Sequence, residues 1–172
     1  MNVIKLLPDE LINQIAAGEV IERPASVLKE VLENCVDAGA TEIDIHLMQG
    51  GLKLIRVTDN GAGISKEDLP YALTRHATSK ISNQDDLQKI VSLGFRGEAL
   101  ASIAAVAQVE LKTKTQDAKT GTNIYIEGGG FQFQEPIQTA EGSNFSVKNL
   151  FYNVPARRKF LKNNNVEFRH II

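Results

Sequence analysis

Residues 24–64, PASVLKEVLENCVDAGATEIDIHLMQGGLKLIRVTDNGAGI, contain the pattern that decides the fold. Pro24 suits a first helical turn, and apolar residues follow it at the spacing of one helix face, which predicts a helix that ends at Gly39. Alternation of apolar and polar residues over 43–47 then predicts a half-buried strand. Two consecutive glycines predict a hairpin turn into a second strand at 52–58. The stretch therefore predicts a helix beside an antiparallel hairpin.

The rest of the chain continues this mixture of helices and strands. Ser65 and Asp68 form a capping-box signature, which predicts a helix over residues 66–76. Further helices are predicted at residues 8–17 and 98–106, and further strands at residues 109–115, 123–127, 131–134 and 144–149. Hairpins combined with a few helices predict an α+β fold, a two-layer sandwich in which helices cover a mixed, mostly antiparallel sheet.

Length and composition are those of one globular domain. The chain has 172 residues, of which 42% are hydrophobic and 23% are charged, and this excludes a disordered chain. No apolar run approaches the roughly 20 residues that are needed to span a bilayer. The single cysteine, Cys35, excludes an internal disulfide framework and a cysteine-based zinc site, and it favours a cytoplasmic location. Since Cys35 lies within the apolar helical stripe, we expect it to be a small buried core residue.

Charge is unevenly distributed along the chain. The net charge is −2, yet residues 151–172 contain five basic residues and one acidic residue. The cluster of Arg157, Arg158 and Lys159 predicts either a contact with DNA phosphates or a role in ordering a loop or facing a neighbouring domain. Residues 166–172 read as the start of an apolar helix stripe without a stop signal, so we expect the chain to be a fragment of a longer protein.

Glu30 and Asn34 are a candidate polar pair on the first quoted helix. They are four residues apart, so both side chains lie on one face of that helix, beside its apolar stripe. A glutamate there can orient and deprotonate a water, and an asparagine oxygen is a hard, neutral ligand that suits Mg²⁺. A solvated pair of polar residues explains the same spacing, so this pair alone does not decide the function.

Two glycine-containing motifs are candidate ligand-binding loops. Asp59 follows a predicted strand, and its carboxylate can accept a hydrogen bond from the exocyclic amine of a ligand. Gly61 and Gly63 allow the backbone to come close to such a flat ligand, although an ordinary turn explains the same residues. Residues 94–100, GFRGEAL, lead into a helix N-terminus that presents free N–H groups to phosphate, although a loop that simply starts a helix fits as well. The chain contains neither GxxxxGK[ST] nor GxGxxG, which excludes a Walker-type P-loop and leaves a Rossmann site without support.

Together, the three elements are far more specific than any one of them. In the order E-x-x-x-N, D-x-G-x-G and G-x-x-G they resemble the GHKL ATPase superfamily, which includes type II topoisomerase ATPase domains and Hsp90. The stretches NQIAAGEVIERPASVLKE, DAGAT, RHATSKI, GFRGEALASI and FYNVPARRKF are similar to the MutL family of DNA mismatch-repair proteins within that superfamily. This resemblance covers essentially the whole chain.

The resemblance implies a Bergerat-type sandwich with ATP and Mg²⁺ as ligands. It implies that Glu30 is the general base, that Asn34 coordinates Mg²⁺, and that Asp59 accepts a hydrogen bond from the adenine amine with Gly61 and Gly63 beside the base. The lid over the nucleotide and the phosphate contacts then fall on Thr78, Ser79 and Lys80 and on Gly94, Phe95, Arg96, Gly97, Glu98, Ala99 and Leu100. Ser143 stands where the family usually carries threonine, near Asp59.

The resemblance also implies a domain arrangement and partners. Residues 1–172 would form the N-terminal ATP-binding domain, with a second domain and a C-terminal dimerisation domain outside this chain. Slow hydrolysis of Mg·ATP would gate dimerisation into a homodimer and recruitment of a MutS-type mismatch-recognition protein and downstream repair factors, with non-specific DNA contacts and no membrane. The alternatives are a nucleotide-gated binding module with negligible hydrolysis and an Hsp90-like chaperone. The GFRGEAL and PARRKF stretches argue against the chaperone.

Overall fold

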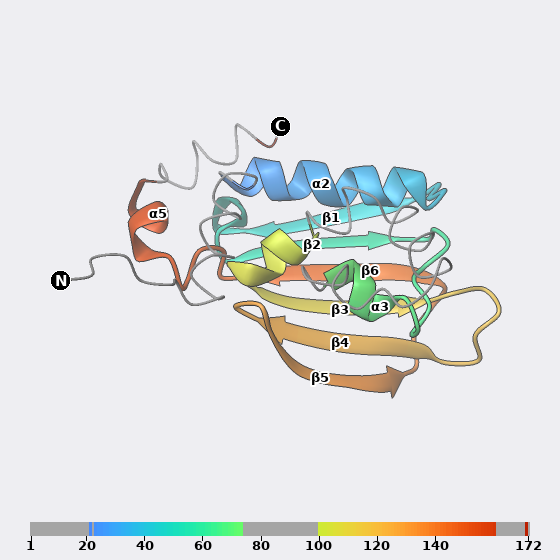
Figure 1. Cartoon of the computed structure of the whole chain (residues 1–172). Helices are drawn as coiled ribbons and strands as arrows, with labels where there is room; N and C mark the ends of the chain where they lie inside the picture. Colours follow the sequence, from blue (N-terminus) through green and yellow to red (C-terminus); the bar gives the residue numbers. More distant parts are fainter. Residues whose placement is uncertain (1–20, 22, 74–99, 161–170, 172) are drawn as a thin grey trace, which may run out of the picture.

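The computed structural model describes residue 21, residues 23–73, residues 100–160 and residue 171 (Figure 1). These residues form one sheet with helices packed against it. In chain order the elements are α2 (Pro24–Asp37), β1 (Ile43–Met48), the 3-10 turn η1 (Gln49–Gly51), β2 (Leu54–Asp59), α3 (Leu69–Leu73), β3 (Gln108–Lys114), β4 (Gly121–Glu127), β5 (Gly130–Ile137), β6 (Gly142–Lys148) and α5 (Pro155–Phe160). A further helical stretch spans residues 100–105.

The sheet has six strands in the order β1-β2-β6-β3-β4-β5. Each of the five pairings between these strands is antiparallel, and three of them, β1–β2, β3–β4 and β4–β5, join consecutive strands. β6, the last strand in sequence, lies between β2 and β3 and so joins the N-terminal hairpin to the β3–β4–β5 meander. This insertion brings the end of β2 beside the start of β6, and it creates the part of the sheet on which the candidate site is built.

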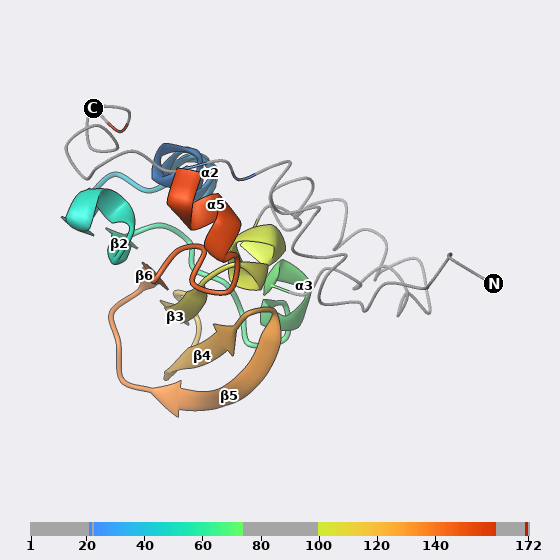
Figure 2. The same ribbon diagram turned by 90° about the vertical axis from the view of Figure 1, so that its left-hand side faces the viewer.

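The fold has two layers, and the core lies between them. Figure 2 shows α2, α3 and the helical stretch at residues 100–105 on the same face of the sheet. The strands turn alternate apolar side chains toward this layer: Ile55, Val57, Val109, Leu111, Ile124, Ile126, Phe145 and Val147 are all buried. From the helical side, α2 contributes Val27, Leu28, Val31 and Cys35. The predicted α+β sandwich, including the buried position of Cys35, is therefore confirmed.

β1 is an edge strand that the helical layer covers incompletely. The predicted alternation places Ile43, Ile45 and Leu47 on the helix-facing side, opposite Asp59, Val57 and Ile55 of β2. Ile43 and Leu47 pack partly against the core, but 46% of Ile45 remains exposed. The strand is less buried than the alternation alone predicts, because α2 packs over β2, the next strand inward.

The helix predicted at residues 66–76 begins later than expected. The Asp68 N–H donates to the Ser65 hydroxyl at 3.3 Å, so the capping interaction is present, but residues 66–68 form a turn and α3 starts at Leu69. Pro70 explains the start, because proline lacks the N–H that a residue inside a helix donates and therefore belongs in the first turn. Residues 74–76 lie outside the described part of the chain, as does the helix predicted at residues 8–17. Among the described residues, no helix is long and apolar enough to cross a membrane.

Candidate functional site

A row of polar side chains interrupts the apolar, helix-facing surface of the sheet at one end. Asp59 of β2 pairs in register with Ser143 of β6, which also pairs with Thr113 of β3, and Thr113 pairs with Thr122 of β4. Two residues along, the equivalent row is apolar: Val57, Phe145, Leu111 and Ile124. The core therefore becomes polar at the end of the sheet where β2 stops. We call Asp59, Ser143, Thr113 and Thr122 the polar row.

Both carboxylate oxygens of Asp59 accept hydrogen bonds from the protein. The Gly61 N–H donates to Oδ1 at 2.8 Å, and the Cys35 thiol donates to Oδ2 at 3.2 Å. One contact comes from the loop after β2 and the other from α2, so the carboxylate is held between two elements. Burial raises the pKa of the Cys35 thiol to about 12, and the hydrogen bond and charge of Asp59 add to the shift. The thiol therefore keeps its proton and remains a donor at neutral pH.

The two glycines of the motif after β2 are required by protein neighbours. A Cβ on Gly61 would lie 2.9 Å from the Cβ of Ala38. Gly63 has a φ of +73°, and a Cβ on it would collide with the backbone carbonyl of Lys114. The loop also donates the Ala62 N–H to the Ala38 carbonyl at 2.9 Å. Close packing against the end of α2 and against β3 thus fixes this loop below the helix.

Asn60 has a structural role that its sequence motif did not indicate. Its side-chain oxygen accepts the N–H groups of Thr41 and Glu42, at 2.9 and 3.0 Å, and its amide nitrogen donates to the Thr41 hydroxyl at 2.8 Å. These bonds fasten the connection between α2 and β1 to the end of β2. The Asn-Gly pair at residues 60–61 was a recognisable turn signal, but the partners of the side chain lie outside the motif.

Glu30 and Asn34 lie on one side of α2, as the spacing predicts. The Asn34 side-chain N–H donates to the Glu30 backbone carbonyl at 2.8 Å, and both residues are partly exposed. Asn34 directly precedes Cys35, which contacts Asp59, and Glu30 lies about one helical turn further toward the helix N-terminus. Toward the N-terminus of α2, Cys35 with its contact to Asp59 is therefore followed by the amide of Asn34 and then by the carboxylate of Glu30.

Thr113 is a second residue that the sequence analysis did not single out. Its hydroxyl accepts the Ile64 N–H at 2.8 Å and lies 2.9 Å from the Ser143 hydroxyl and 3.1 Å from the Gly142 carbonyl oxygen. It is 1% exposed. The alternation of Val109, Leu111 and Thr113 in β3 was the available signal, because it placed a threonine on the buried face. Through Thr113, the loop after Asp59 is tied to both β3 and β6.

Part of the predicted site lies outside the described residues. This applies to Thr78, Ser79 and Lys80 and to Gly94, Phe95, Arg96, Gly97, Glu98 and Ala99. Leu100 is described, and its side chain is buried in the core. A contact between Leu100 and a phosphate would therefore involve its backbone.

The basic cluster in α5 makes contacts within the chain. Arg158 donates from Nη1 to the Leu150 carbonyl oxygen at 3.1 Å, and the Arg157 guanidinium lies 5.9 Å from the centroid of the Phe151 ring. Lys159 is exposed. These contacts support the role of ordering a loop, which was one of the two alternatives for this segment.

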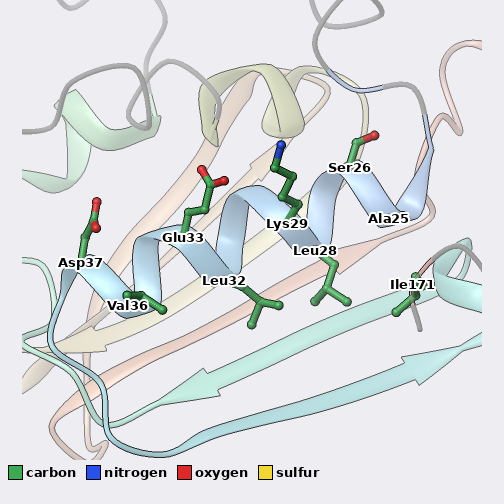
Figure 3. Close-up of a pocket in the computed structure, with 9 residues that line it drawn as sticks. All are labelled: Ala25, Ser26, Leu28, Lys29, Leu32, Glu33, Val36, Asp37 and Ile171. Carbon is green, nitrogen blue, oxygen red and sulfur yellow. The ribbon is translucent and has the colours of Figure 1, made fainter.

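A groove on α2 does not coincide with the polar row. Figure 3 shows its lining, with Leu28 and Leu32 on one side of the helix and Ser26, Lys29 and Glu33 on the other. Ala25, Val36, Asp37 and Ile171 complete the lining. Its volume is about 640 Å³, and neither Glu30, Asn34 nor Asp59 lines it.

Comparison with known proteins gives a consistent result. A family model described as "Histidine kinase-, DNA gyrase B-, and HSP90-like ATPase" matches residues 21–149, which include Glu30, Asn34, Asp59 and Ser143. The DNA mismatch repair protein MutL of Chloroherpeton thalassium is 57% identical over 171 residues, which are 99% of this chain and 27% of that protein. MutL of Parabacteroides distasonis is also 57% identical, over 99% of this chain and 28% of its own length.

Solved structures extend the likeness to the fold. The Aquifex aeolicus MutL ATPase domain complexed with ADP has a TM-score of 0.69 and 34% identity, over 88% of this chain and 52% of that one. The N-terminal domain of a DNA repair protein has a TM-score of 0.82 and 30% identity, over 96% of this chain and 48% of that one. The chain thus spans little more than a quarter of the length of the curated relatives and about half of these structures. It belongs to the histidine kinase-, DNA gyrase B- and HSP90-like ATPase family, and its resemblance to MutL mismatch-repair proteins is confirmed.

Proposed function

We propose that this chain is the N-terminal ATP-binding domain, residues 1–172, of a MutL-type mismatch-repair protein, and that it binds Mg·ATP and slowly hydrolyses it. The observation that supports this most directly is the position of Asp59, which two elements hold at the polar end of the core beside α2. The 57% identity to MutL proteins favours mismatch repair over an Hsp90-type chaperone.

Asp59 would bind the adenine base. A carboxylate accepts hydrogen bonds and donates none, so it suits an exocyclic amine and repels a carbonyl oxygen in the same position. Gly61 and Gly63 keep the neighbouring backbone close to α2 and β3, and the Ser143 hydroxyl lies opposite Asp59 in register. This arrangement would give the site its preference for adenine over guanine.

Asn34 would hold Mg²⁺ through its side-chain oxygen. Its amide nitrogen is engaged by the Glu30 carbonyl, so the oxygen is the atom left to face a ligand. Among the described residues, no group of three or more His, Cys, Asp or Glu side chains could hold a metal. A single amide oxygen fits Mg²⁺, which usually keeps several waters and is bound together with substrate phosphates. When bound, the ion neutralises charge on the phosphates during phosphoryl transfer.

Glu30 would act as the general base. It lies on the same side of α2 as Asn34, one turn further from Asp59. Asp59, Asn34 and Glu30 thus follow one another in the order in which a nucleotide carries its base, its phosphates and the phosphate that water attacks. The Glu30 carboxylate would accept a proton from the attacking water. Phosphoryl transfer depends mainly on positioning and charge stabilisation, which this order supplies.

The remaining contacts of the nucleotide are proposed on sequence grounds alone. Thr78, Ser79 and Lys80 would belong to the lid, and the backbone N–H groups of residues 94–100 would bind the phosphates. ATP binding would promote homodimer formation in the whole, cytoplasmic protein, together with recruitment of a MutS-type partner and downstream repair factors. Non-specific DNA contacts would involve Arg157, Arg158 and Lys159, of which Lys159 is the most available, and would weaken steeply with salt.

An Asp59→Asn substitution in the full-length protein tests the proposal. The amide adds a donor that faces the adenine amine, so ATP affinity should fall by about tenfold or more, as for a lost hydrogen bond to a charged group. Titration calorimetry with a non-hydrolysable ATP analogue and Mg²⁺ measures it. Asp44→Asn is the matched control, because Asp44 is exposed on β1 and points away from the helical layer. Unchanged affinity in the Asp59 variant would reject the adenine assignment.

A further inference from the structure

We infer that Cys35 is a positioning residue for base recognition: its thiol holds the Asp59 carboxylate in the orientation that accepts the adenine amine. The inference rests on the proposed function of Asp59. It assigns to the single cysteine of the chain a task other than filling space in the core.

The geometry shows how the thiol acts on Asp59. The Cys35 Sγ lies 3.2 Å from Oδ2, and the Gly61 N–H occupies Oδ1 at 2.8 Å. Two donors on different oxygens prevent rotation of the carboxylate about its last side-chain bond. Each ionised oxygen has a further lone-pair direction, so the carboxylate remains able to accept from a ligand. Without the thiol, only the Gly61 contact would orient it.

The surroundings of Cys35 favour a polar role over a purely apolar one. It is 3% exposed and follows Val27, Leu28 and Val31 on the buried side of α2, where a valine would fill similar space. The thiol differs from such a residue by its S–H donor, and that donor is directed at an anion, where hydrogen bonds are strongest.

The thiol should therefore affect affinity for one part of the ligand only. If Cys35 orients Asp59, its loss weakens the contact with the exocyclic amine of adenine and leaves the contacts with sugar and phosphates unchanged. A residue that merely supports the fold would change the affinity for every nucleotide alike. Comparison of ATP with purine riboside triphosphate, which lacks the amine, separates these two cases.

The experiment uses three variants of the full-length protein. Cys35→Val keeps the volume and removes the donor, Cys35→Ser keeps a donor, and Val31→Ala is a packing control on the same buried stripe. Dissociation constants for both triphosphates are measured with Mg²⁺, without turnover, on protein whose folding is checked by thermal unfolding. If Cys35→Val is poorly folded, Cys35→Ala replaces it.

The expected result is a selective loss of affinity. In Cys35→Val, ATP affinity should fall about fivefold, as for the loss of a hydrogen bond of ordinary strength, with purine riboside triphosphate unaffected. Cys35→Ser and Val31→Ala should retain the wild-type preference for ATP. Equal losses for both ligands, or none, in Cys35→Val would overturn the role of Cys35 and leave that of Asp59 intact. A wild-type protein that binds both ligands equally would instead overturn the proposed role of Asp59, and this inference with it.

Discussion

Asp59 and Ser143 face each other in the antiparallel register of β2 and β6, at the first point where the helix-facing surface of the sheet turns from apolar to polar. The pairing exists because β6 inserts between β2 and β3. It places a carboxylate from the N-terminal hairpin beside the Ser143 hydroxyl of β6, which in turn lies beside the Thr113 hydroxyl of β3. The polar row is thus assembled from four strands, and the Thr113 and Ser143 hydroxyls at its centre lie within hydrogen-bond distance of each other.

Thr113→Val should destabilise the protein and loosen the loop after Asp59. Valine has a similar shape but leaves the Ile64 N–H and the Ser143 hydroxyl without their partner. An unsatisfied buried donor costs about 1–3 kcal/mol of unfolding free energy, which urea denaturation measures. Thr122→Val in the same row is the control, since Thr122 lies outside these bonds, and it should cost less. Equal effects of the two substitutions would contradict the role of Thr113 as a connection.

Gly63→Ala should be more damaging than Gly39→Ala. Both glycines have a positive φ, +73° and +77°, and an alanine in that region costs about 1–2 kcal/mol at either position. At Gly63 the new methyl group would also collide with the Lys114 backbone. At Gly39, by contrast, no atom of the described residues beyond its chain neighbours lies within 4 Å of the new Cβ. The difference between the losses of unfolding free energy in the two variants therefore measures the cost of the collision between the loop and β3. A difference near zero would show that the loop moves aside without loss.

Glu30→Ala should separate nucleotide binding from hydrolysis. The variant lacks the proposed base but keeps Asp59 and Asn34, so we expect ATP affinity to stay within about threefold of wild type, while turnover falls by about 100-fold or more. Phosphate release by the full-length protein measures turnover, and Glu33→Ala on the same helix is the control. Turnover that survives the loss of Glu30 would assign water activation to another group.

The Cys35 thiol should make stability fall at high pH. Its pKa is raised from 9.0 to about 12 in the folded chain, so the folded state binds this proton more tightly than the unfolded state does. The stabilising contribution is therefore complete below about pH 9 and is lost as the pH rises toward 12. Urea unfolding of wild type between pH 7 and about 10.5 should show a steeper decline of the unfolding free energy than that of Cys35→Ser, which has no titrating group at position 35. Parallel curves would mean that the thiol titrates as it does in the unfolded chain.

Much of the fold could be predicted from local patterns. The spacing of apolar residues in α2 and the alternation in β3 indicate which side of each element is buried, because burial imposes the period of the backbone on the sequence. The same patterns place Glu30 beside Asn34, and Asp59 at the end of a strand. These are properties of single elements, so a single stretch of sequence carries them.

The contacts between elements could not be predicted in this way. Periodicity does not state which strand lies beside which. The position of β6, and the pairing of its Ser143 with Asp59 on one side and Thr113 on the other, therefore emerge only in the folded sheet. Burial of Cys35 was predicted, but its bond to Asp59 depends on how far α2 extends over β2. Asn60 likewise accepts hydrogen bonds from Thr41 and Glu42, and no pattern within its own turn predicts these partners.

The central place of β6 also constrains the order in which the chain can fold during synthesis. Until residues 142–148 have left the ribosome, β2 and β3 each lack the neighbour that covers one edge. Nascent chains that end earlier hold two separate β-units with open edges, and open edges pair readily with other chains. The polar row cannot form before that moment, so nucleotide can help to stabilise the domain only after translation has passed β6.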